Sequence, residues 1–129
     1  MNQNSSRIFE LFRSVKPFIF RPNMRNTSKA GKSEEPSRSG LHLSTVLDAM
    51  ADDTRLNILR QLAFSGEKAC GTFGIEVPKS TLSHHFRVLR LAGVVSVRRE
   101  GKELINSIRR EDLEARFPGL LDSVVSPSV

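Results

Sequence analysis

The sequence predicts a mainly α-helical domain with one small β-hairpin, and three observations lead to this fold class. Apolar residues recur at three- and four-residue intervals, as on one face of a helix, along most of residues 41–125. The segment "VVSVRREGKELINSI" alternates side-chain types around a glycine turn, which is typical of a hairpin. The chain has 129 residues, which is enough for one domain with a modest core.

The first 40 residues differ in composition from the rest. Residues 22–40 are rich in Ser, Pro, Gly, Asn and charge, which predicts a flexible linker. Ahead of them, "RIFELFRSVKPFIF" could form a short amphipathic helix, and its Arg-rich character also resembles a transit peptide. For residues 1–40 we favour a mobile basic arm, or an upstream extension of the reading frame, and not a transit peptide. A folded domain over 41–125 and a tail over 126–129 follow.

Two helices are expected to begin the folded domain. The first has apolar residues at the i, i+3, i+4 and i+7 positions of one face, namely Leu43, Val46, Leu47 and Met50. Asp52 or Thr54 can then supply the side-chain oxygen that caps a second helix over about 53–64. Its inward face is expected to carry Leu56, Leu59, Leu62 and Ala63.

The strongest helical pattern covers residues 79–92 and ends before Gly93. Between it and the second helix, "EKACGTFGIEVP" allows only a short helical turn around 68–73, because two glycines and a proline interrupt it. The hairpin follows over 94–108. Pro118-Gly119 then divides the last apolar stripe into two short helices, over about 110–116 and 118–125.

The order of elements is helix, helix, short helix, long helix, hairpin and C-terminal helices, which is the layout of a winged helix-turn-helix domain. Positive charge is concentrated in the same place, since residues 79–110 hold eight Lys and Arg against two Asp and Glu. A polyanionic partner is therefore expected at the long helix and the hairpin. That partner is predicted to be double-stranded DNA.

The long helix would act as the recognition helix. Small hydroxyl and histidine side chains at its front can approach base edges in the major groove, while basic residues further along it and on the hairpin reach phosphates. The expected DNA-binding residues are Lys79, Ser80, Thr81, Ser83, His84, His85, Arg87, Arg90, Arg98, Arg99 and Lys102. Adjacent helical residues point about 100° apart, so His84 and His85 are not expected to share a metal ion, and His85 could equally pack inward.

The chain lacks the usual signs of an enzyme. It has no Gly-rich phosphate loop and no metal-ligand cluster, and the acidic residues Glu111, Asp112 and Glu114 suit the start of a helix. Cys70, the single cysteine, is expected to be a buried filler or else a redox sensor whose pKa Lys68 could lower. No cofactor is expected, no apolar run is long enough to span a membrane, and a reducing, cytoplasmic location fits best.

The motifs "ADDTRLNILRQL" and "STLSHHFRVLRLAGVVSVRREGK" resemble the ArsR family of bacterial winged-helix transcriptional repressors over about 41–108. Ser83 and His85 match the Ser and His of the family's recognition helix, and residues 99–102 match its wing. The sequence departs from the family pattern where Asp53 replaces the usual Pro and Phe86 replaces Leu.

The resemblance implies a homodimer that is paired through its first and last helices and binds a palindromic operator. The dimerisation residues would be Leu43, Val46, Leu47, Met50, Leu113, Phe117, Leu120, Leu121 and Val124. Family members that sense metals use a cysteine pair before the recognition helix, or Asp and His residues of the last helix. Residues 109–129 contain no His, so we expect no metal site of either type.

The sequence thus favours a sequence-specific transcriptional repressor. Two alternatives stay open: a winged-helix module that contacts an acidic protein, and a redox-responsive regulator based on Cys70.

Overall fold

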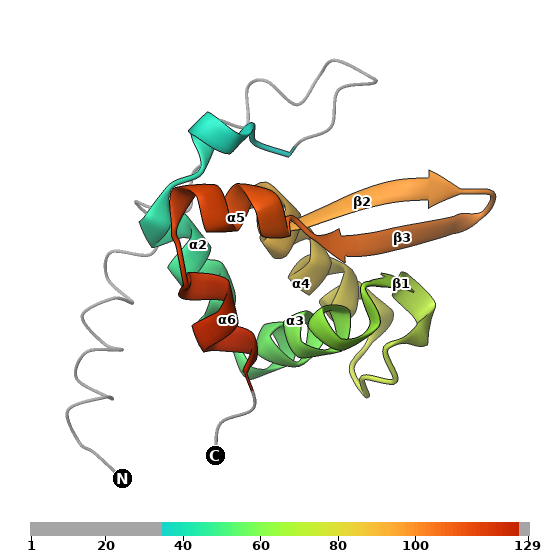
Figure 1. Ribbon diagram of the computed structural model, residues 1–129. Helices are drawn as coiled ribbons and strands as arrows, with labels where there is room; N and C mark the ends of the chain where they lie inside the picture. The colour runs from blue at the N-terminus through green and yellow to red at the C-terminus, as the bar shows by residue number, and fades with distance from the viewer. Residues whose placement is uncertain (1–34, 127–129) are drawn as a thin grey trace, which may run out of the picture. The chain divides into compact units, whose positions relative to one another are not determined.

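A computed structural model describes residues 35–126, and its helical core is built from three helices that contact one another (Figure 1). They are α2 (Leu43–Met50), α3 (Asp53–Ser65) and α4 (Lys79–Leu91). The side chains buried between them include Val46, Ile58, Leu59, Leu62 and Leu89. The apolar spacing in the sequence therefore predicted the three main helices correctly.

The helix ends follow from local chemistry. Asp52 caps α3, because its Oδ1 accepts a hydrogen bond of 3.0 Å from the backbone N–H of Arg55. After the last residue of α4, Gly93 adopts a φ of 82°, the left-handed conformation that suits glycine after a helix. Both signals were readable in the sequence.

The sheet has three antiparallel strands rather than the two that were predicted. β2 (Val95–Glu100) and β3 (Glu103–Ile108) form the hairpin that projects from the helices as the wing (Figure 1). The helical turn expected around 68–73 is confirmed over Cys70–Thr72, which form a 3-10 turn, but the strand before it was not predicted: β1 (Glu67–Ala69) pairs with the other edge of β3. Pairing with a strand almost 40 residues away supplies the hydrogen bonds that this glycine-containing segment could not make locally.

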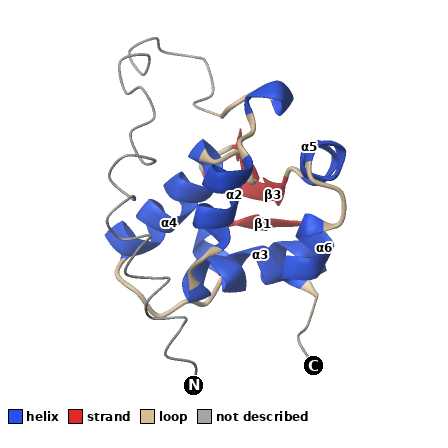
Figure 2. Cartoon of the chain, turned by 90° about the vertical axis from the view of Figure 1, so that its left-hand side faces the viewer, coloured by secondary structure: helices blue, strands red, loops and turns tan. Residues whose placement is uncertain are grey.

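Two short helices close the domain. α5 (Arg110–Arg116) and α6 (Leu120–Val125) are separated by a turn in which Gly119 has a φ of 81°. The predicted break at Pro118-Gly119 is confirmed, although Pro118 lies in the turn instead of the first turn of the helix. Figure 2 shows α4 and α5 on opposite sides of the domain.

Residues 35–40, which composition had assigned to the flexible linker, are packed on the domain. Arg109 Nη1 donates a hydrogen bond of 2.6 Å to the Pro36 carbonyl, and Arg38 Nε lies 2.6 Å from Asp112 Oδ1. We call residues 35–40 the strap. The helix expected over 8–15 and the rest of the basic arm lie outside the described residues.

Candidate nucleic-acid interface

The front of α4 is a row of exposed polar side chains. Its apolar residues face the core, where Phe86 and Leu89 are buried and the Phe86 ring packs edge-to-face on Phe73 with centroids 5.1 Å apart. This orientation turns the opposite stripe to solvent. The residues exposed there include five of the predicted DNA contacts: Lys79, Ser80, Thr81, Ser83 and His84.

The first turn of α4 has unused hydrogen-bond donors. Pro78 occupies the N-cap position and no side chain caps the helix, so the first backbone N–H groups have no side-chain acceptor among the described residues. The positive end of the helix dipole lies at the same place. Donors and dipole together favour a negatively charged group next to Lys79 and Ser80.

The two histidines of α4 have different surroundings. His84 is exposed, whereas the His85 side chain is 12% exposed and its Nδ1 lies 3.1 Å from Arg55 Nη1. Their ring centroids are 5.9 Å apart. Of the two roles left open for His85, the structure favours packing, and its place among the predicted base contacts is corrected accordingly.

The pKa of His85 lies below its ordinary value. Burial is the largest cause, and the neighbouring charges of Arg55 and His84 act in the same direction. The carboxylate of Asp52, whose Oδ1 is 3.8 Å from His85 Nδ1, acts against them. The neutral imidazole is therefore favoured in this arrangement.

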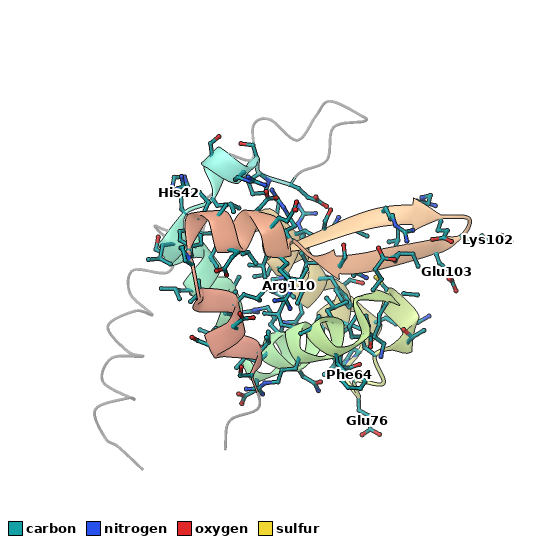
Figure 3. The ribbon with its side chains drawn as sticks, viewed as in Figure 1. His42, Phe64, Glu76, Lys102, Glu103 and Arg110 are labelled. Carbon is teal, nitrogen blue, oxygen red and sulfur yellow. The ribbon has the colours of Figure 1, made fainter. Side chains whose placement is uncertain are left out.

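The wing contributes fewer available charges than the sequence suggested. Arg98 Nη2 is 2.7 Å from Glu67 Oε2 on β1, and its Nη1 also pairs with Glu100. These carboxylates raise the pKa of Arg98. By contrast, among residues 35–126 no ion pair involves Arg99 or Lys102, and Lys102 stands beside Glu103 at the tip of the wing (Figure 3).

The two basic residues that follow the wing form ion pairs within the domain. Arg109 pairs with Asp112 at 2.8 Å, and Arg110 pairs with Asp122 at 3.1 Å. Arg38 and then Arg109 keep the pKa of Asp112 below its usual range. The structural interpretation of the acidic run at the start of α5 is confirmed for Asp112.

Cys70 is half-buried and contacts a residue that the sequence analysis did not single out. Asn106 on β3 is fully buried, and its Nδ2 donates a hydrogen bond of 3.0 Å to Cys70 Sγ. The ammonium group of Lys68 donates to Gln61 Oε1 at 2.8 Å and lies over the ring of Phe73. No group of three or more potential metal ligands is arranged to hold an ion within residues 35–126.

The nine predicted dimerisation residues divide into three sets by their exposure. Leu43 and Leu47 on α2 are 48% and 44% exposed, so they remain available to a partner. Three more are half-buried: Phe117, Leu120 and Val124. The chain's own core buries the remaining four, which are Val46, Met50, Leu113 and Leu121.

Arg55 is the residue that sequence reasoning missed. It is 7% exposed and occupies the first position of the buried stripe Arg55, Ile58, Leu59, Leu62 on α3. Of the predicted inward residues, Leu59 and Leu62 are buried, whereas Leu56 and Ala63 are only half-buried. An arginine at a core-facing position of a helix was the available signal, because such a charge is seldom buried without partners.

This fold, with its exposed helix front and adjoining wing, defines a winged helix-turn-helix protein that binds DNA. A family model described as "Bacterial regulatory protein, arsR family" matches residues 52–97. An uncharacterized HTH-type transcriptional regulator of Bacillus subtilis, YceK, is 34% identical over 82 residues, which cover 61% of this chain and 82% of the relative. The chain belongs to the ArsR family of transcriptional regulators.

One further relative and one solved structure are also similar to this chain. The "cadmium resistance transcriptional regulatory protein CadC homolog" of Staphylococcus aureus is 32% identical over 85 residues, covering 64% of this chain and 70% of the relative. A crystal structure of a "possible transcriptional regulator for arsenical resistance" is 28% identical, has a TM-score of 0.48, and is matched over 64% of this chain and 84% of the other. Both curated relatives are named as transcriptional regulators.

The side chains of this protein do not fit a soft-metal site of the kind that several thiolates would form. The chain contains one cysteine, Cys70, and its sulfur accepts a hydrogen bond from Asn106. Within residues 35–126, no helix has the length and apolar character needed to cross a bilayer.

Proposed function

We propose that the protein is a homodimeric repressor that reads a palindromic operator with α4 and steadies itself on DNA with the wing. The observation that carries this proposal is the exposed front of α4, where small hydroxyl side chains stand at the uncapped end of the helix. Such side chains can approach base edges closely, and they both donate and accept hydrogen bonds.

Base reading is assigned to the exposed residues Ser80, Thr81, Ser83 and His84. Ser83 and His84 lie one turn into the helix, beyond the N-terminal donors that suit a phosphate. This separation lets the first turn fix the position of the helix on the backbone while the second turn meets the bases.

Phosphate contacts are assigned to basic residues on both elements. On α4 they are Lys79, Arg87 and Arg90, and on the wing they are Arg99 and Lys102. Arg98 is assigned a lesser role, because its guanidinium is already paired with Glu67 and Glu100. Contacts of this kind give affinity and salt dependence without sequence preference.

The homodimer is proposed to form on the side of the domain away from the wing. Leu43 and Leu47 are the large apolar side chains exposed on α2, and α2 and α6 both lie opposite the wing in Figure 1. The half-buried residues Leu120 and Val124 on α6 extend the apolar surface on this side. Pairing here would leave both copies of α4 and both wings open to DNA.

The test is a selection of duplexes bound by the full chain from a random pool at about physiological salt, with the mass of the protein measured by sedimentation. A palindrome with half-sites about one helical turn apart, together with a dimeric mass, supports the proposal. A folded dimer that recovers no motif contradicts operator reading and favours a protein partner. A monomer that recovers a single half-site contradicts the homodimer alone.

Cys70 is a second candidate, for the signal that releases DNA. Its sulfur contacts Asn106 on β3, so a group attached to it would disturb β3, the wing strand that pairs with both β1 and β2. Alkylation with iodoacetamide should weaken binding to the selected duplex in the native chain and leave Cys70→Ser unaffected. Equal binding by alkylated and untreated native protein would contradict this role.

A further inference from the structure

We propose that Arg55 and His85 are positioning residues for DNA recognition: their buried contact holds α4 against the corner between α2 and α3, and protonation of His85 opens it. The inference rests on the proposed function, since it concerns how the same helix is presented to DNA. Neither side chain is proposed to touch DNA.

Arg55 joins three helices through one guanidinium group. Its Nε donates a hydrogen bond of 2.6 Å to the Ala49 carbonyl, and its Nη2 is 3.4 Å from the Asp48 carbonyl. Both carbonyls belong to the last turn of α2, and the Asp48 carbonyl also accepts the backbone N–H of Ala51. A cation there also suits the negative end of the helix dipole.

The third contact of Arg55 reaches the recognition helix. Its Nη1 lies 3.1 Å from His85 Nδ1, across 30 residues of sequence. Arginine can only donate hydrogen bonds, so Nδ1 must accept and the ring proton must reside on Nε2. The imidazole is neutral in this arrangement. Because Ser83 and His84 immediately precede His85 in α4, this anchor fixes the direction in which the proposed base contacts point.

A second proton on the ring would remove this contact. It would occupy Nδ1, abolish the acceptor and place an imidazolium against the Arg55 guanidinium. The charged and titratable groups facing the ring are Arg55 and Asp52 at the start of α3 and His84 on α4. Among these groups, only Asp52 would favour the imidazolium, and its Oδ1 already accepts a hydrogen bond of 3.0 Å from the backbone N–H of Arg55.

The direction of the pH effect follows from this balance. Burial holds the pKa of His85 below its ordinary value of 6.5. The contact is therefore fully formed above about pH 6.5, the value for an unfolded histidine, and is lost as the pH falls through the lowered value. Mild acid should loosen α4 from the α2–α3 corner while the rest of the domain remains folded.

Four variants separate this contact from general stability. In His85→Asn the amide oxygen takes the place of Nδ1 and accepts from Arg55, but it does not titrate. His85→Leu keeps a side chain of similar size without an acceptor. Arg55→Lys retains the charge and loses the planar fork that serves several acceptors at once. His42→Asn makes the same substitution at an exposed histidine outside α4, at the start of α2, and is the matched control.

The experiment measures the full chain against the duplex recovered by the selection described above and against random duplex, from pH 8 to pH 5.5. We expect the native preference for the selected duplex to fall by about tenfold toward pH 5.5. His42→Asn should keep this profile and His85→Asn should flatten it. His85→Leu and Arg55→Lys should show the reduced preference at every pH, with unfolding curves to confirm that each variant is folded.

Nuclear magnetic resonance of the imidazole nitrogens tests the contact without DNA. Neutral His85 should carry its proton on Nε2, and Arg55→Lys should raise its pKa. A ring protonated on Nδ1 at pH 8, or a His85→Asn profile identical to that of the native chain, overturns the inference. A native protein that selects no duplex at any pH overturns the proposed function instead, and the inference for DNA recognition falls with it.

Discussion

The recognition helix and the wing each carry three basic side chains, but the two elements differ in the carboxylates that lie near these charges. α4 contains no acidic residue, so no carboxylate within the helix offsets Lys79 and Arg90. The wing carries Glu100 and Glu103 and adjoins Glu67 on β1, and two of these carboxylates hold Arg98. The comparison teaches that the charge available to DNA depends on strand pairing as well as on residue counts.

The two elements also differ in how firmly they are fixed. α4 is anchored in its middle by Arg55 and ends at Gly93, which is enclosed by Leu41 and Pro36. The turn at the wing tip has no such surroundings, since nothing lies within 4 Å of the position that a side chain on Gly101 would occupy. The helix proposed to read base sequence, α4, is therefore held rigidly, whereas the wing tip, proposed to contact the DNA backbone, can adjust its position.

The largest expected effect tests this contrast in rigidity. Gly93→Ala should destabilise the fold by about 3 kcal/mol, because φ is 82° and the new Cβ would lie 2.1 Å from Leu41 Cδ2 in a fully buried region. Gly101→Ala, with a φ of 62° and open space, should cost about 1 kcal/mol. Urea denaturation measures both, and equal losses would refute the difference between the two sites.

The second effect concerns the role of α4 in reading sequence. Ser83→Ala should weaken binding to the selected duplex by about tenfold and leave binding to random duplex almost unchanged, since only a base contact is lost. Fluorescence anisotropy at a fixed salt concentration measures both affinities. A similar loss on the two duplexes would assign Ser83 to the backbone.

The helices of this domain were predictable because their signals are local. Apolar spacing set α2, α3 and α4, and Asp52 and Gly93 marked two of their ends. β1 was missed because a three-residue strand with two flanking glycines nearby has little local preference, and its hydrogen-bond partners on β3 lie far along the chain. Secondary structure that depends on distant pairing leaves only a weak pattern in its own segment.

The candidate site was predictable in its residue types and less so in their partners. The exposed front of α4 follows from the apolar stripe behind it, so Ser80, Thr81 and Ser83 were assigned to the correct face. The contact of His85 with Arg55 spans 30 residues, and that of Arg98 with Glu67 spans 31. Neither contact could be inferred from the spacing of residues within one element.

The third effect compares two neighbouring arginines of the wing. Arg99→Ala should weaken binding to all duplexes by about threefold and reduce the salt slope by about one, because a phosphate contact is lost. Arg98→Ala should change affinity by less than about twofold and leave the slope unchanged, since its charge is held by Glu67 and Glu100. Anisotropy titrations between 50 and 300 mM salt, roughly the range in which counterion release is resolved, measure both slopes. A reduced slope for Arg98→Ala would mean that DNA displaces its carboxylate partners.

The smallest expected effect is on thermal stability and concerns the base of the wing. The strap contacts this base but not the tip. Glu35 accepts hydrogen bonds of 2.9 Å from the Val97 N–H and the Ser96 hydroxyl, and Asp112 pairs with Arg38 and Arg109. Because these arginines hold the pKa of Asp112 below 3.8, its stabilising contribution is complete above that pH and is lost as the pH falls through the lowered value.

Asp112→Asn should therefore lower the unfolding temperature by about 3 °C at pH 6 and make little difference in strong acid, where the native carboxylate is also neutral. Calorimetry at both pH values measures this, with Glu111→Gln as the control on the same helix. If Asp112→Asn lowers the unfolding temperature equally in strong acid, the carboxyl group acts by packing and not by charge. If it has no effect at pH 6, the strap does not stabilise the base of the wing, and the wing is then adjustable along its whole length.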